Sequence, residues 1–349
     1  MLTVGSFCAS CVNRSQKMTW DLIAEAKSIH EPNFSHPLFL DPNNGMVISG
    51  LEMIRSADGG RTWSSISLSS GKEFYSFAFA DHQNGWAVGT DSDNKPLIMM
   101  TVDGGFTWQS VTFDQQAVEE VKATKVTDIC LTSGQVWLLT ENSITGPIRD
   151  PSGNEIWSRR QLGNNAIVRA VINDTTLRIV NVFYMPDRLR SISCTSTGEV
   201  WAVGDRSAVF HYENGWKNAA SEVDKKYTFL RAASSGKDVW LVGADWSETE
   251  SVVAGFPRAG VLLRSRDNGQ TWRDETPSSA SLLSDLILAD GKGWLIGAQG
   301  SIFFSSDSGN FWTKIESPTR NNLSQIFFLD SQNIWIVGEQ STILRLSKN

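Results

Sequence analysis

The chain is poor in the residue types from which zinc-type metal sites and disulfide frameworks are commonly built. Its 349 residues include only four cysteines, four histidines and four tyrosines. Cys8 and Cys11 form a lone C-x-x-C near the start, but no further Cys or His stands at a spacing that completes a metal site. We therefore expect no metal and no cofactor, and we interpret residues 1–17 as a flexible tail.

Long hydrophobic runs and an excess of positive charge are also missing. No stretch approaches the roughly 20 apolar residues of a membrane helix, so no membrane span is expected. The net charge of −7 argues against a general nucleic-acid binder. Residues 1–16 lack a basic segment before their short apolar run, which favours the cytoplasm; removal of an upstream signal would instead mean a periplasmic or secreted protein. We expect a monomer.

What the chain does have is a repeated eight-residue motif, Ser/Thr-x-Asp-x-Gly-x-x-Trp. The four copies are Ser56–Trp63, Thr101–Trp108, Ser265–Trp272 and Ser305–Trp312. The Asp carboxylate can accept backbone N–H groups of a turn, and the Gly can take a positive φ. The Trp can begin the return strand and bury a large ring. We therefore predict structural rather than catalytic roles for Asp58, Asp103, Asp267 and Asp307, and likewise for Trp63, Trp108, Trp272 and Trp312.

The tryptophans follow a second pattern, in which seven segments each contain an apolar strand, a turn and a second apolar strand. The second strand opens at Met46, Trp86, Trp137, Trp201, Trp240, Trp294 and Trp335. An outer strand of each unit opens at Trp20, Trp63, Trp108, Trp157, Trp216, Trp272 and Trp312. Of the fourteen tryptophans only Trp246 is left over. A period of roughly 40 residues is the size of a propeller blade.

The two ends of the chain complete each other in this pattern. Trp20 opens an outer strand with no blade before it, whereas the last blade stops after its third strand, 342–346. Pairing of the two would close the ring and limit exposed strand edges. The sequence therefore predicts an all-β domain over residues 18–349, a single seven-bladed β-propeller of four-stranded antiparallel blades that the N-terminal strand closes.

The alignment of the blades also yields a prediction for the two remaining cysteines. Cys130 and Cys194 each precede the second-strand Trp by seven residues. Apolar residues occupy this position in the other blades: Phe39, Phe79, Ala233, Ile287 and Phe328. We therefore expect both cysteines to act as small core hydrophobes and not to form a disulfide.

Insertions interrupt the repeat at residues 113–124, 161–189 and 243–260. They belong to second-to-third loops and blade connections, which emerge on the face opposite the boxes, and we expect recognition on this loop face. The 161–189 segment is long enough for a hairpin between 166–172 and 177–183. Candidate partner-binding residues are Arg159, Arg160, Arg169, Arg178, Arg188, Arg190 and Trp246. Arginines without lysines suit carboxylate recognition, so a protein partner with an acidic segment is predicted. The alternative is internal ion pairing, the commoner fate of such charges.

The four boxes resemble Asp-box (bacterial neuraminidase) repeats. Together with Gly85–Gly89, the box at Thr101–Trp108 resembles the photosystem II stability/assembly factor family and its bacterial relatives, over about residues 18–349. That resemblance implies a seven-bladed propeller whose boxes are structural and lie away from the ligand-binding face. It also implies a non-catalytic binding or assembly factor with an Arg-rich surface patch.

The alternative is a glycan-binding or sialidase-like propeller. Sialidases have an Arg-Ile-Pro motif and a Tyr nucleophile with an acidic partner. The motif is missing here, and we expect Tyr75 and Glu73 to point to opposite faces of a strand. We therefore predict that the protein is not an enzyme.

Overall fold

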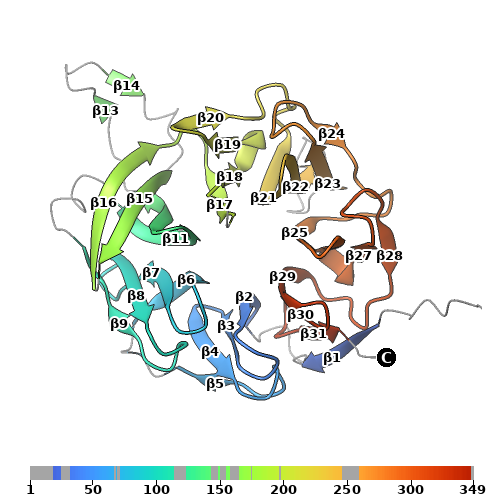
Figure 1. Ribbon diagram of the computed structural model, residues 1–349, viewed down its shortest axis with the longest axis horizontal. Helices are drawn as coiled ribbons and strands as arrows, with labels where there is room; N and C mark the ends of the chain where they lie inside the picture. The colour runs from blue at the N-terminus through green and yellow to red at the C-terminus, as the bar shows by residue number, and fades with distance from the viewer. Residues whose placement is uncertain are drawn as a thin grey trace, which may run out of the picture.

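The structure, a computed structural model, forms a ring of seven radially arranged sheets (Figure 1). It describes residues 19–24, 32–66, 68, 71–113, 123–142, 148–149, 155–157, 165–173, 175–195, 198–245 and 259–346. The predicted tail, residues 1–17, lies outside this part of the chain. Two short 3₁₀ turns, η1 (Asp205–Ser207) and η2 (Ala298–Gly300), are the helical elements of the described residues.

Each blade is an antiparallel sheet whose first strand lies nearest the central axis. Blade 1 contains β2 (Phe34–Phe39), β3 (Gly45–Ser49), β4 (Glu52–Ser56) and β5 (Ser64–Ser65), and blade 2 contains β6 (Glu73–Phe79), β7 (Gly85–Thr90), β8 (Pro96–Thr101) and β9 (Gln109–Ser110). Blade 3 contains β11 (Ala123–Thr132), β12 (Gln135–Asn142), β15 (Asn165–Asn173) and β16 (Thr176–Tyr184), and blade 4 contains β17 (Leu189–Cys194), β18 (Val200–Gly204), β19 (Val209–Tyr212) and β20 (Trp216–Asn218). Blade 5 contains β21 (Tyr227–Ser235), β22 (Asp238–Asp245), β23 (Ala259–Ser265) and β24 (Arg273–Asp274). Blade 6 contains β25 (Leu283–Ala289), β26 (Lys292–Gly297), β27 (Ile302–Ser305) and β28 (Thr313–Ile315), and blade 7 contains β29 (Leu323–Asp330), β30 (Asn333–Gly338), β31 (Ile343–Leu346) and β1 (Trp20–Ala24).

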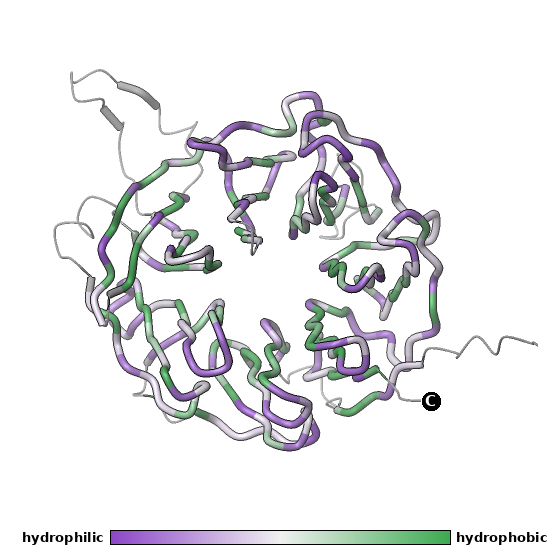
Figure 2. Tube along the Cα trace, viewed as in Figure 1, coloured by the Kyte–Doolittle hydropathy of each residue, from purple (hydrophilic) through white to green (hydrophobic). Residues whose placement is uncertain are grey.

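The core is divided among the junctions between neighbouring blades. The second strands are buried on both faces; every residue of β18 and of β30 is buried, and both strands are almost wholly apolar. One cluster joins Val88 and Ile98 of blade 2 to Val126 and Ile129 of blade 3. Figure 2 shows hydrophobic residues running along the strands of the ring. The apolar side chains of the second strands therefore pack between neighbouring blades and hold them together.

The ring closes as predicted, through the N-terminal strand. β1 pairs antiparallel with β31, placing Trp20 opposite Leu346 and Asp21 opposite Arg345. The Trp20 side chain is 5 % exposed and packs in the cluster that holds Trp294 and Ile336. The seventh blade thus combines strands from both ends of the chain (Figure 1).

Blade 3 departs from the predicted strand assignment, and the prediction for Trp157 was wrong. The hairpin of β15 and β16 is not an insertion between blades but supplies the third and fourth strands of blade 3. Trp157 instead lies in β14 (Glu155–Trp157), which pairs only with β13 (Ile148–Arg149) in a separate two-stranded sheet (Figure 1). The nine-residue strands of the hairpin form long ladders with β12 and with each other, and Ala166, Ile167 and Val168 are buried. β10 (Thr112–Phe113) adds a fifth strand, parallel to β16.

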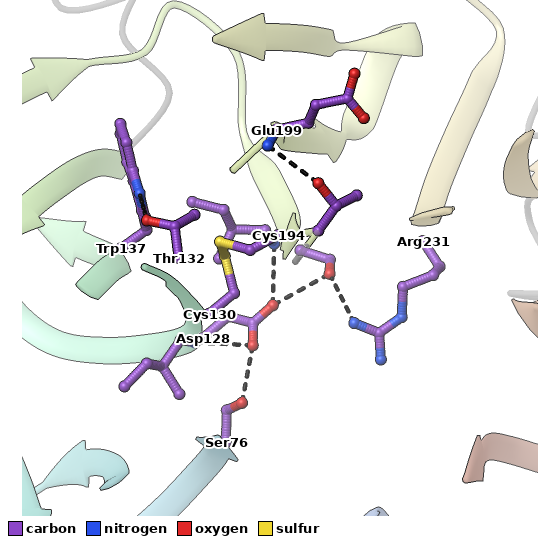
Figure 3. Close-up of a disulfide and its surroundings, with 12 residues drawn as sticks. Ser76, Asp128, Cys130, Thr132, Trp137, Cys194, Glu199 and Arg231 are labelled. Carbon is purple, nitrogen blue, oxygen red and sulfur yellow. Dashed lines mark hydrogen bonds between the residues drawn. A yellow bond between two sulfur atoms is a disulfide. The ribbon is translucent and has the colours of Figure 1, made fainter. Parts of the chain in front are cut away.

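Cys130 and Cys194 form a disulfide, contrary to the prediction that they are unpaired core residues. Their Cα atoms lie 5.5 Å apart, on β11 and β17 of adjacent blades (Figure 3). The first strands converge toward the axis, so equivalent positions of neighbouring blades come within disulfide range there. The alignment identified Cys130 and Cys194 as equivalent positions, and the closed ring brings the two together.

Candidate functional site

The two ends of the ring differ in the turns that they carry. Each Asp-box turn lies against the turn between the first two strands of its own blade; the amide of Gly59 donates to the carbonyl of Asn43 at 2.9 Å, and that of Ser308 to Gly291 at 2.8 Å. The boxes therefore share one face, the box face. The second-to-third turns and the blade connections form the opposite face, the loop face.

The box carboxylates are engaged in holding their own turns. Oδ1 of Asp58 accepts the N–H groups of Arg61 and Thr62 at 2.9 Å each, and Oδ2 accepts the Thr62 hydroxyl at 2.6 Å. These hydrogen bonds, led by that of the hydroxyl, lower the pKa of Asp58 to about 2. The Gly of each box lets the turn approach the preceding blade: a Cβ on Gly269 would lie 2.8 Å from the Trp201 ring.

A cavity of about 1040 Å³ occupies the centre of the ring. Its rim includes the second-to-third turns at Gly50, Gln299 and Glu339, and the blade connections at Asn33 and Asn322. The cavity therefore opens on the loop face, away from the Asp boxes. It is large enough for a peptide segment or a small ligand.

The cavity wall is shaped by a bulge that recurs in the first strand of every blade. Register shifts occur between Ser35 and Leu38 in blade 1 and at equivalent levels in the other six blades. The bulged residues that line the cavity are His36, Thr127, Arg190, Leu230, Ser284 and Ser324. Bulges re-aim side chains, and in six of the seven blades a bulged residue lines the cavity.

The residues that follow six of the bulges form a polar ring: Ser76, Asp128, Ser191, Arg231, Asp285 and Gln325. Asp128 is 7 % exposed and joins three blades, as Figure 3 shows. It accepts the Ser76 hydroxyl at 2.8 Å and its neighbour's amide, Ile129 N–H, at 2.9 Å. From blade 4 it accepts the Ser191 hydroxyl at 3.1 Å and the Ile192 amide at 3.0 Å. Four donors satisfy this buried carboxylate.

Asp285 makes the same kind of contact between blades 6 and 7 as Asp128 makes between blades 3 and 4. Arg231 links Asp285 to Ser191 of blade 4. Asp285 accepts the amides of Leu286 at 2.9 Å and Ile326 at 3.0 Å. Arg231 donates from Nε to Asp285 at 3.1 Å and from a terminal nitrogen to the Ser191 hydroxyl at 3.2 Å. Burial opposes the guanidinium charge, but the carboxylates of Asp285 and Asp128 together outweigh this and raise the pKa of Arg231. The cavity thus contains a fixed, fully charged guanidinium.

His36 completes the wall in blade 1 with a strained backbone, at φ 50°. Its amide donates to the side-chain carbonyl of Gln325, and its ring lies 6.3 Å from that of Phe77. Burial lowers the pKa of His36 to about 4; Asp128 works against the shift and Arg231 adds to it. The imidazole is therefore neutral at pH 7.

The carboxylates of this wall are not arranged for glycoside hydrolysis. The carboxylate oxygens of Asp128 and Asp285 already accept hydrogen bonds from structural donors. Neither carboxylate is therefore free to protonate a leaving group or attack a sugar. Tyr75 donates to Glu73 at 2.7 Å, which corrects the prediction that the two point to opposite faces: residues two apart in a strand share a face. Burial raises the pKa of Tyr75, which keeps the phenol protonated rather than nucleophilic.

The described residues contain no group of three or more His, Cys, Asp or Glu side chains placed to hold a metal ion. Nor does this part of the chain form a helix of the length and hydrophobicity needed to cross a bilayer.

The structure brings only some of the candidate arginines to the cavity mouth. Arg190 lines the cavity and binds Asp205 through two hydrogen bonds of 2.7 and 3.0 Å. Arg188 lies beside it in sequence, 54 % exposed, with a terminal nitrogen 3.6 Å from Glu141. Arg178 is exposed on β16, the outer strand of blade 3. Arg159, Arg160 and Trp246 lie outside the described residues.

Arg169 occupies a repeat position within the blade. It lies opposite Trp137 in the ladder, with its guanidinium 5.6 Å from that ring. It also donates to Gln135 at 2.9 Å and to the Tyr212 hydroxyl at 3.1 Å. Arg264 over Trp240 repeats this stacking at 4.6 Å, as does Arg345 over Trp335 at 4.9 Å. The role of Arg169 is thus to stack on the blade's second-strand Trp.

The polar ring and His36 were missed by reasoning from the sequence, although a signal exists. Asp128, Arg231 and Asp285 each stand nine residues before the second-strand Trp of their blade. Ionisable residues at one repeat position of an otherwise apolar strand indicate a polar layer. The hydrogen bonds that satisfy it cross from blade to blade and depend on the closed ring.

Comparison with known proteins supports the same architecture. Residues 55–167 match the family model described as photosynthesis system II assembly factor YCF48. Photosystem II assembly lipoprotein Ycf48 of Synechococcus sp. (strain CC9902) is 25 % identical, over 86 % of this chain and 94 % of the relative. The chloroplastic photosystem II stability/assembly factor HCF136 of Arabidopsis thaliana is 22 % identical, over 87 % of this chain and 73 % of the relative.

Solved structures share the fold. YCF48 bound to a D1 peptide superposes with a TM-score of 0.66 at 18 % identity, covering 95 % of this chain and 97 % of that one. Virginiamycin B lyase from Staphylococcus aureus gives 0.63 at 12 % identity, covering 95 % and 100 %. The fold therefore hosts both binding proteins and enzymes. This chain is a BNR-type propeller that resembles the photosystem II assembly factors.

Proposed function

We propose that this protein is a non-catalytic assembly factor that binds a segment of a protein partner at the mouth of the central cavity. The observation that carries the proposal is the wall itself. It places the fixed guanidinium of Arg231 beside a volume suited to a peptide, whereas its buried carboxylates are engaged by structural hydroxyl and amide donors. Such a wall supports binding and not acid–base chemistry.

The relatives support the same role. The curated relatives are named as photosystem II assembly factors, and the solved relative holds a D1 peptide. We infer that this chain binds a comparable segment, with Arg190 at the mouth, and the exposed Arg188 two residues before it, attracting acidic residues of the partner. Arg169 and Arg178 fall outside the binding surface in this proposal, because one stacks within blade 3 and the other lies on its outer strand.

The proposed location is an oxidising compartment such as a periplasm or lumen. The inter-blade disulfide favours it, since disulfides persist where thiols are not kept reduced. The names of the relatives, which include lipoproteins and a chloroplast protein, agree with this placement.

Peptide binding tests the function. Synthetic peptides that tile the D1 protein, each with a scrambled control, would be titrated into the full chain by fluorescence anisotropy. We expect one segment to bind and Arg190→Gln to raise its Kd by about tenfold or more. Arg178→Gln is the matched control and should leave the Kd unchanged.

Two outcomes would contradict the proposal. If no D1 peptide bound more tightly than its scrambled version, the partner class would be wrong. If Arg178→Gln weakened binding and Arg190→Gln did not, the binding surface would lie on the rim of blade 3. Circular dichroism of each variant would establish that the ring remains folded.

A further inference from the structure

The junction between blades 3 and 4 combines a disulfide with the lack of an intact box. At junctions that carry an intact box, the turn packs on the second-strand residue of the preceding blade; the Gly309 turn lies against Trp240, and Gly59 accepts a hydrogen bond from Trp335 Nε1 at 3.1 Å. Blade 4 has no intact box, and Trp137 is covered instead by Tyr212 and Trp216. The Cys130–Cys194 bond lies at this same junction.

Asp128 accepts hydrogen bonds from Ser76, Ile129, Ser191 and Ile192, and we call this set the Asp128 clamp. The disulfide and the clamp lie next to each other, and both link β11 to β17. Cys130 follows Asp128 by two residues on β11, and Cys194 follows Ile192 by two residues on β17. Figure 3 shows the sulfur bridge directly beside the carboxylate that gathers Ser76 and Ser191. Any change in the spacing of β11 and β17 therefore acts on Asp128 and on the cavity wall that it organises.

The junction between blades 6 and 7 offers a natural comparison. Asp285 holds Leu286 and Ile326 just as Asp128 holds Ile129 and Ile192, with the same two kinds of amide. The positions of the two cysteines are taken there by Ile287 and Phe328, which pack in one apolar cluster. A covalent bond thus supports the hydrogen bonds of Asp128, whereas apolar packing supports the equivalent hydrogen bonds of Asp285.

We propose that the Cys130–Cys194 disulfide is a redox-controlled staple of the cavity wall, opened by a dithiol reductant. Cys130 is 9 % exposed and Cys194 is more accessible, so the reductant's thiolate attacks the sulfur of Cys194. A mixed disulfide forms with Cys194, and Cys130 leaves as a thiolate that takes up a proton. The second thiol of the reductant then releases Cys194, so two protein thiols form as the dithiol becomes a disulfide.

Reduction loosens the wall because the Asp128 clamp loses its covalent neighbour. The small thiols that remain do not fill the space that Ile and Phe occupy at the other junction. The hydrogen bonds of Ile129 and Ile192 to Asp128 then open more often, and the cavity wall is less well defined for a partner. This last consequence rests on the proposed function, whereas the loosening does not.

Hydrogen exchange of the full chain, oxidised and reduced with dithiothreitol, measures the staple without any ligand. Mass mapping of alkylated peptides would show the state of Cys130 and Cys194 in each sample. On reduction the amides of Ile129 and Ile192 should exchange at least about tenfold faster, while those of Leu286 and Ile326 stay unchanged. The double variant Cys130→Ile/Cys194→Phe copies the blade 6–7 junction and should be insensitive to dithiothreitol.

The second readout is binding of the D1 segment that the peptide titration identifies. The Kd of this segment should rise about fivefold or more on reduction. Equal exchange of Ile129 and Ile192 in both states would overturn the staple, as would free thiols at Cys130 and Cys194 in the unreduced protein. Absence of any binding by the oxidised chain would count against the proposed function instead. An unchanged Kd despite faster exchange would overturn the link between staple and cavity.

Discussion

Phe311 shows how much a single residue of the Asp box matters. In three boxes a threonine hydroxyl donates to the second carboxylate oxygen at 2.6 Å: Thr62, Thr107 and Thr271. In the fourth box that position holds Phe311, whose side chain is 69 % exposed. Asp307 therefore lacks a hydrogen bond that its counterparts have, and an aromatic ring lies in water.

Phe311→Thr should stabilise the protein. The new hydroxyl completes the turn, so the free energy of unfolding should rise. Chemical denaturation would measure it, and Thr107→Phe is the reciprocal control, expected to destabilise by a similar amount. A destabilised Phe311→Thr protein would show that the ring makes contacts that this account leaves out.

His36 predicts a pH dependence with a definite sign. Its pKa is lowered to about 4 in the folded state, from about 6.5 in an unfolded chain. The neutral imidazole stabilises the fold fully above pH 6.5, and this contribution is lost as the pH falls from 6.5 through 4. His36→Asn tolerates the positive φ but cannot take up a proton there.

The melting temperature of the wild type should therefore fall by several degrees between pH 6.5 and pH 4, and that of His36→Asn by less. The difference between the two proteins isolates the histidine from the carboxylates that titrate in the same window. Parallel pH profiles would contradict the assigned pKa of His36.

At the scale of strands, the sequence predicted best where one residue type recurs at a fixed spacing. The six tryptophans of the second strands, with Met46 in the first blade, located seven blades, and Trp20 located the closing strand. Blade 3 was misassigned because Trp157 fits the spacing, whereas β15 and β16 form longer ladders. The disulfide was missed because alignment shows which positions are equivalent but not that equivalent positions meet at the axis.

Deletion of residues 1–30 tests the closing strand. The last blade would lose the β1–β31 ladder and the buried ring of Trp20, so the free energy of unfolding should fall by about 3 kcal/mol or more. Thermal melting of the truncated and full chains measures this. A truncated chain that melts within about a degree or two of the full one would show that β1 contributes little.

In the molecule as a whole, the structural Asp-box turns and the cavity mouth lie on opposite faces of the ring. The box face carries turns whose carboxylates are engaged locally, and the loop face carries the cavity mouth. The sequence predicted recognition on the loop face, which stays a prediction, and the cavity opens on that face. It could not predict the polar ring, whose partners come from three or more blades and meet only after closure.

Site-specific photocrosslinking tests most directly whether the cavity mouth is the binding surface. Benzoylphenylalanine would replace Leu230, a bulged residue of the cavity wall, or Phe106, which is 61 % exposed in the box of blade 2. With the D1 segment bound, the account predicts a crosslink from position 230 and none from position 106. A crosslink from position 106 alone would contradict it, because the partner would then occupy the face that the Asp boxes build.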